Sequence, residues 1–271
     1  MFIGWIRDKS FIADLELFST CIVVDKSLMI KTYQQNKSLS FGAYDENKLV
    51  AFISAYEFYD SFIINNFYYM DKINNDIKKR LMKLLLENID EDEKTILFMS
   101  RKNEQDLLLS FNFKKYANFQ RAVYGREAVA FNFTNATDKS ISNENYIPVM
   151  TSLDKRAYGE NRVSYSKDAL FKQSSLMLST AFGYQHSYAI NKSLVKISPW
   201  IMEDAAFSDA EKMLRGVIYH RGLKKLFAFV PSDVKEITDL YTSYKFDMSD
   251  EYTLLYKNEK PKINLEMIYA F

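Results

Sequence analysis

The chain has 271 residues, of which 48% are hydrophobic and 15% aromatic, and its formal net charge is +1. This length accommodates one large domain or two domains of ordinary size, each with a packed core. The near-zero net charge argues against a general nucleic-acid-binding protein, because such proteins usually carry a clear basic excess.

Cysteine and histidine usage restricts the class further. Cys21 is the only cysteine, so no intrachain disulfide can form, and His186 and His220 are too few for a histidine-based metal cluster. No apolar run reaches the length of a membrane span, and the first residues lack the order of a signal peptide. We therefore expect a cytoplasmic protein that binds no metal, no nucleic acid and no membrane.

In chain order, the first half predicts a helix, three strands, a helix, a strand, a helix and a strand. The turn Asp45-Glu46-Asn47 between two strand-like runs indicates a hairpin. Asn112 is suited to a left-handed stop after the third helix. The expected helices are 25–34, 75–88 and 103–111, and the expected strands are 40–44, 49–56, 62–69, 94–100 and 116–125.

A polar stretch at 132–145, rich in Asn, Ser, Thr and Asp, is the best candidate for a linker. After it, the order strand, helix, strand, helix, strand recurs, which predicts two copies of one architecture. We therefore expect domains at 1–131 and 146–271. The second half predicts helices at 149–157, 166–178, 205–221 and 233–243, and strands at 181–190, 194–201, 226–230 and 251–256.

Five stretches of the sequence are informative together. They are "LSFGAYDENKLVAFISAY" and "SRKNEQDLLLSFNFKKYANFQRAVY" in the first half, and "DKRAYGENR", "ISPWIMED" and "FVPSDVKEITDLYTSYKF" in the second. These stretches resemble the GNAT family of N-acetyltransferases, in a tandem arrangement. The resemblance implies an α/β (α+β) fold with two GNAT-like domains, each a mixed twisted sheet flanked by helices.

This resemblance implies a mechanism for the chain. Acetyl-CoA would lie where two central strands separate, with its pantetheine arm pairing with the backbone of 66–70 and its pyrophosphate on the turn into the next helix. A small amine would attack the thioester carbonyl directly, with a carboxylate as base and a tyrosine as acid. The cofactor-binding residues that the resemblance implies are Tyr68, Tyr69, Met70, Asn75, Asp76, Ile77, Lys78, Lys79 and Asn103.

The turn "INNDIKK" departs from the family pattern, which places an arginine or glutamine and two small residues there. In this chain those small positions fall on Asp76 and Lys78. Asp76 would favour an empty helix start but repel a pyrophosphate, so Asn75 or Asp76 is expected to be a helix cap. Lys78, Lys79 and Arg80 could neutralise a diphosphate, or form an ordinary solvated face. Glu203 and Asp204 make the second half a poorer candidate for a donor site.

The expected catalytic residues come from both halves. Glu57 follows an apolar strand and is the candidate base. The alternative is that Glu57 is only a solvated glutamate at the end of that strand. Tyr241 matches the position of the family's acid, with a packed aromatic as the alternative, and Leu108 stands at that position in the first half.

Three functions remain open at this stage. The first is an acyl-CoA-dependent N-acyltransferase acting on a small amine, and the second is a catalytically degenerate GNAT-like binding or regulatory protein. The third is an acyltransferase that takes its acyl group from an acyl carrier protein. The expected oligomeric state is a monomer or a homodimer.

Overall fold

A computed structural model gives the structure of the chain and describes residues 1–89, 94–125 and 143–271. The chain divides into two compact units: unit 1 comprises Met1–Lys115 and Leu255–Lys260, and unit 2 comprises Tyr116–Leu254 and Pro261–Phe271. Most of the expected linker 132–145 lies outside the described residues. The division between the units falls after Lys115, near the start of strand β6 (Lys114–Tyr124). Each unit also includes a segment from the last part of the chain.

Unit 1 is built on a mixed sheet with the strand order β1-β2-β3-β4-β5, followed by the end of β11. Strands β1 to β4 pair antiparallel in succession, and β5 runs parallel to β4. The strands are β1 (Phe2–Trp5), β2 (Ser40–Asp45), β3 (Lys48–Glu57), β4 (Ser61–Tyr69), β5 (Thr95–Arg101) and β11 (Asp247–Lys257).

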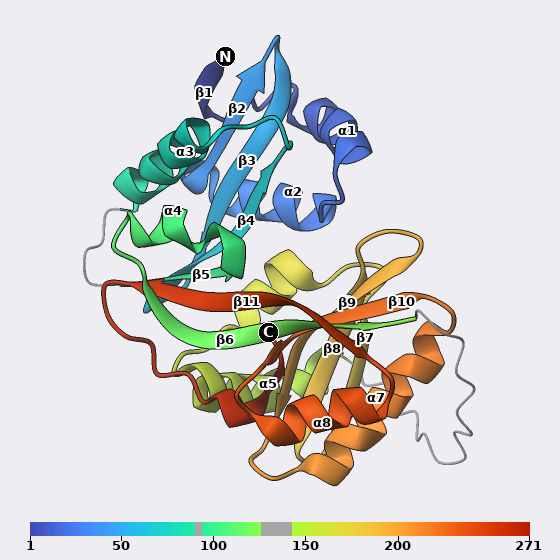
Figure 1. Cartoon of the computed structure of the whole chain (residues 1–271). Coiled ribbons are helices and arrows are strands. Elements are labelled where there is room, and N and C mark those ends of the chain that lie inside the picture. The colour runs from blue at the N-terminus through green and yellow to red at the C-terminus, as the bar shows by residue number, and fades with distance from the viewer. Residues whose placement is uncertain (90–93, 126–142) are drawn as a thin grey trace. The chain divides into compact units, whose positions relative to one another are not determined.

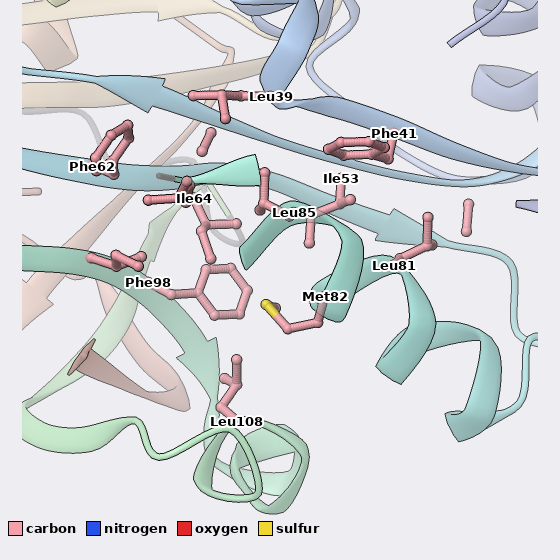
Figure 2. Close-up of a cluster of buried hydrophobic side chains, with 14 of the residues drawn as sticks. Leu39, Phe41, Ile53, Phe62, Ile64, Leu81, Met82, Leu85, Phe98 and Leu108 are labelled. Atoms are coloured by element: carbon pink, nitrogen blue, oxygen red, sulfur yellow. The ribbon is translucent and has the colours of Figure 1, made fainter. Parts of the chain in front are cut away.

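Helices cover both faces of the unit 1 sheet (Figure 1). Helices α1 (Phe11–Cys21) and α2 (Lys26–Gln35) bury an apolar stripe against one face, where Phe11 stacks on Phe52 of β3. Helix α3 (Asn75–Asn88) buries Leu81, Met82 and Leu85 against the other face (Figure 2). The sheet strands are therefore apolar on both faces, which explains their nearly continuous hydrophobic runs.

The sequence pattern did not predict two elements of unit 1, strand β1 and helix α1. Strand β1 is short, and helix α1 carries buried side chains at Phe11, Leu15 and Phe18. That spacing of four and three residues is the usual helical period, so the pattern was present in the sequence. The predicted helix 25–34 is confirmed as α2, and the side chain of Asp25 caps it by accepting the Leu28 N–H at 3.0 Å.

Unit 2 repeats the arrangement with the order β11-β6-β10-β9-β8-β7. Helices α7 (Phe207–Arg221) and α8 (Lys235–Ser243) pack their apolar side chains with strand residues into one core. The remaining elements are α5 (Asn143–Tyr158), α6 (Val163–Tyr165), η3 (Ser166–Leu170), β7 (Leu176–Thr180), β8 (Gly183–Ala189), β9 (Leu194–Met202), β10 (Lys225–Pro231), η4 (Leu265–Met267) and β12 (Ile268–Ala270).

The predicted helix 166–178 is wrong in its second half, where strand β7 begins at Leu176 and pairs with β8. Helical structure ends at Leu170, and the edge-strand pairing with β8 decides the conformation of the residues after it. Strand β12, which pairs with β9, was not predicted at all. Among the described residues, no helix is long and apolar enough to cross a membrane.

Candidate functional site

Strands β4 and β5 separate partway along their length in unit 1. Their parallel pairing covers only Ser61–Ile64 against Thr95–Phe98, although β4 continues to Tyr69 and β5 to Arg101. At the same point the register between β3 and β4 shifts, because Ser54 pairs with Asn66 whereas Ala55 pairs with Ile64. Asn65 is therefore the extra residue of a β-bulge, a feature that bends a strand and often lies beside an active site.

A polar network surrounds this bulge within otherwise apolar strands. The Asn65 amide donates to Thr32 Oγ1 of α2 at 2.7 Å, and the Asn66 amide donates to Ser54 Oγ at 2.8 Å and to Asn65 Oδ1 at 3.0 Å. Asn66 is buried, and its Oδ1 accepts no hydrogen bond from the part of the chain that the structure describes. Such an orphaned acceptor is costly in a protein interior and needs a reason to be retained. The Asn-Asn pair inside the run "FIINNFYYM" was the signal in the sequence.

Helix α3 is the next element after β4, and Asn74 caps it. The Asn74 side chain accepts the Ile77 N–H at 3.1 Å. The expectation that Asn75 or Asp76 is the cap is therefore wrong, because both residues lie inside the first helical turn. Asp76 is exposed there, where its charge interacts favourably with the helix dipole.

Side chains from three elements meet at the open end of the separation. The Tyr69 hydroxyl, at the end of β4, donates to the Glu104 carboxylate in η2 (Lys102–Glu104), which follows β5. The Lys78 ammonium of α3 lies 3.7 Å from the centre of the Tyr69 ring. Burial and the neighbouring Glu104 raise the pKa of the Tyr69 phenol, so this hydroxyl keeps its proton at neutral pH. Sequence reasoning missed Glu104, because it lies 35 residues from its partner.

The other expected donor-binding residues are distributed over β4, the residue after it, α3 and η2. Lys79 is exposed on the first turns of α3, whereas Ile77 packs against the core beneath the helix. The Met70 N–H donates to the Val50 carbonyl at 3.0 Å, and Tyr68 packs on the α1 and α2 side of the sheet. Asn103 belongs to η2, and the position of its side chain lies outside the described structure.

The candidate base Glu57 lies at the end of β3, opposite Phe62 at the start of β4. Its carboxylate accepts the Lys94 ammonium at 2.9 Å, and 42% of the Glu57 side chain is exposed. Asn65, the bulge residue, is three positions further along β4 than Phe62, which corresponds to roughly 10 Å along a strand. The structure therefore brings Tyr69, Asp76 and Lys78 to one end of β4 and leaves Glu57 towards the other.

Tyr241 lies in unit 2, and its side chain is fully buried. Its hydroxyl donates to the Tyr269 carbonyl at 2.9 Å, and its ring packs against Trp200 and Phe246. Burial raises the pKa of Tyr241 well above its usual value. These contacts give Tyr241 a packing role in the structure as it stands.

The strand-to-helix connection of unit 2 carries two acids. Helix α7 begins at Phe207, slightly later than expected, so Glu203 and Asp204 lie in the preceding turn. The Glu203 carboxylate accepts the Arg156 guanidinium at 2.8 Å. Among the described residues, no group of three or more His, Cys, Asp or Glu side chains is placed to hold a metal ion.

Comparison with known proteins identifies the fold of the chain. No protein-family model matches the sequence, and no curated protein matches it. Solved structures do match: a protein from Pyrococcus horikoshii assigned as an acetyltransferase is 15% identical, with a TM-score of 0.72 over 100% of this chain and 93% of its own. A GCN5-related N-acetyltransferase from Sphaerobacter thermophilus gives 11% identity and a TM-score of 0.58, over 98% of each chain.

A tandem GNAT protein from the clavulanic acid biosynthesis pathway is also similar, at 10% identity and a TM-score of 0.58, over 94% of this chain and 97% of its own. At such low identities the likeness defines the fold, and the predicted fold class is confirmed. The chain has the fold of the GCN5-related N-acetyltransferases over its whole length.

Proposed function

We propose that the protein is an acyl-CoA-dependent N-acyltransferase that acts on a small amine, with its donor site in unit 1. One observation supports this most strongly: β4 and β5 separate beyond Ile64 and Phe98, and β4 then leads directly into the N-terminus of α3. A strand edge beyond such a separation can hold an extended pantetheine arm, and a helix N-terminus attracts phosphate.

The donor-binding residues in this proposal combine backbone and side-chain groups. The backbone of β4 after the bulge pairs with the pantetheine arm, and the first amides of α3 face the pyrophosphate. Lys78 and Lys79 supply the positive charge that an arginine supplies in the family pattern. This charge compensates for the glycine-free turn and for Asp76, whose carboxylate opposes a diphosphate. Acetyl-CoA is the proposed donor.

Glu57 is the proposed base, acting through water because of its distance from the bulge. Glu57→Gln keeps the size of the side chain and removes the proton acceptor, so kcat should fall by about 10²-fold or more, with little change in KM for the donor. An unchanged kcat would remove Glu57 from the mechanism.

Donor binding is the experiment that tests the proposal. Acetyl-CoA and then CoA are titrated into the protein by calorimetry, and saturable micromolar binding is expected. Lys78→Glu combined with Lys79→Glu should abolish that binding. The matched control is Lys192→Glu with Lys224→Glu, which changes two exposed lysines of unit 2 by the same total charge. Equal affinity in the two double variants would contradict the assignment of the donor site.

A second candidate function is a GNAT-like binding or regulatory protein that has lost its donor. The contact between Tyr69 and Glu104 favours it, because this hydrogen bond connects the end of β4 to η2 across the separation in which a donor would lie. Absence of CoA and acetyl-CoA binding up to millimolar concentration would favour this candidate. It would also favour an acyl carrier protein as the donor, and transfer from an acylated carrier to an amine would separate those two.

A further inference from the structure

Unit 2 contains a second strand separation, and strand β12 lies in it. Strands β9 and β10 pair in parallel only over Leu194–Lys196 and Lys225–Phe227. Beyond that region β12 pairs antiparallel with the end of β9, where Ile268 faces Ile201 and Ala270 faces Trp200. The Phe271 N–H, immediately after β12, donates to the Phe229 carbonyl of β10 at 2.9 Å.

Among the residues that the structure describes, no strand corresponding to β12 pairs in unit 1. Within the residues that the structure describes, β4 and β5 separate in the same way, and no further strand lies between them in the sheet order. That place is the one that the proposed function gives to the pantetheine arm of the donor, so the role inferred for β12 rests on the proposed function. In unit 2, the backbone of β12 makes the strand-like hydrogen bonds that the extended arm would otherwise make.

Strand β12 is also part of the core of unit 2. Ile268, Tyr269 and Ala270 are all 0% exposed. The Tyr269 ring lies 5.2 Å from Trp200, and the Tyr269 carbonyl accepts the hydroxyl of the buried Tyr241. A donor entering this separation would have to expel three buried residues and leave the Tyr241 hydroxyl without its partner, both of which are unfavourable.

We propose that β12 is a built-in occupant of the acyl-donor position of unit 2. Unit 2 therefore binds no acyl donor, and each chain binds one donor equivalent, in unit 1. Asp204 before α7 acts in the same direction, because it places negative charge where a pyrophosphate would lie, whereas the charge of the neighbouring Glu203 is balanced by Arg156.

A reversible covalent lock tests this proposal in the full chain. Ile201→Cys with Ile268→Cys, in a Cys21→Ser background, places two thiols on directly paired residues, a spacing that suits a disulfide. The control lock is Lys196→Cys with Phe227→Cys, which joins the paired end of β9 and β10 and does not hold β12. Donor stoichiometry is measured by calorimetry in the oxidised and reduced forms with desulfo-CoA, which has no thiol to reduce the disulfide.

The expected result is one donor equivalent per chain, with the same affinity in the locked, reduced and control proteins. That single equivalent should disappear when Lys78→Glu and Lys79→Glu are added. Loss of binding, or of one of two equivalents, on locking β12 alone would overturn the proposal, because it would show that the donor enters unit 2 by displacing the strand.

Hydrogen exchange decides the role of β12 independently of donor binding. If β12 is a permanent part of unit 2, the amides of Tyr269 to Phe271 should exchange as slowly as those of the α7 core, with and without added acetyl-CoA. Exchange at least tenfold faster than the α7 core would contradict the proposal, even if unit 1 binds the donor. If neither the locked nor the reduced protein binds desulfo-CoA while the amides of β12 remain protected from exchange, only the proposed function is refuted.

Discussion

Asp76→Asn is a substitution for which the structure predicts two effects of opposite sign. Asp76 is exposed in the first turn of α3, and Asn74 rather than Asp76 caps the helix. Removing the Asp76 charge therefore costs the helix only a charge–dipole interaction, roughly 0.3–1 kcal/mol of the free energy of unfolding. The capping hydrogen bond from Ile77 to Asn74 stays in place.

The same substitution should strengthen donor binding. A carboxylate about 5 Å from one phosphate charge is unfavourable by roughly 0.8 kcal/mol in a water-like dielectric, and more where the site excludes water. A pyrophosphate carries about two such charges, so the repulsion amounts to roughly 1–2 kcal/mol. Asp76→Asn should then lower the Kd for acetyl-CoA by roughly 5- to 30-fold.

Two assays separate these effects. Urea unfolding measures the loss of stability, and calorimetry with acetyl-CoA at low ionic strength measures the gain in affinity. The control is Asp209→Asn in the first turn of α7, which should lower stability at least as much, because Asp209 also pairs with Lys212, and leave affinity unchanged. Unchanged or weaker binding in Asp76→Asn would refute the reasoning, because the carboxylate would then not face the bound phosphate.

The described contacts predict three further outcomes. Asn74→Ala should lower the free energy of unfolding by about 1 kcal/mol in urea unfolding, whereas Asn75→Ala should change it by a few tenths at most. Burial, together with the charges of Arg221, Lys172 and Lys196, lowers the pKa of His186 to about 3 despite its bond to the Ser198 carbonyl. The unfolded chain therefore takes up the proton first, so the contribution of His186 to stability should be constant well above pH 6.5 and fall by roughly 2–3 kcal/mol by pH 4.5. Burial raises the pKa of Asp154 to about 6, which acts in the opposite direction over the same pH range, so the His186 effect is measured as the difference between the chain and a His186→Gln variant. Acid unfolding curves with the same slope in the two proteins would contradict this. Tyr241→Phe should lower the free energy of unfolding by about 1 kcal/mol, measured by thermal or urea unfolding, because the hydrogen bond to the Tyr269 carbonyl is lost. The same substitution should leave any acyltransfer rate unchanged. A large fall in kcat would instead restore Tyr241 as the acid.

Much of the architecture could be predicted from local sequence patterns. The hairpin of β2 and β3, the helices α2 and α3, and the left-handed stop at Asn112, where φ is 65°, all depend on residues close together in the chain. Strand β7 and strand β12 could not be predicted in this way, because each is a strand only through pairing with β8 or β9. Strand β12 has only three residues and β7 only five, so neither shows an alternating pattern long enough to be recognised.

The features of the candidate site also divide into those that the sequence predicts and those that only the structure shows. The sequence by itself determined that the turn before α3 lacks glycine and carries Asp76, that Lys78 and Lys79 come after it, and that the two halves share an order of strands and helices. Only the tertiary structure decided that Glu104 meets Tyr69 and that β12 fills the separation between β9 and β10. The physical reason is that helix and strand periods depend on neighbouring residues, whereas a hydrogen bond across 35 residues or a strand inserted between two others depends on the path of the whole chain.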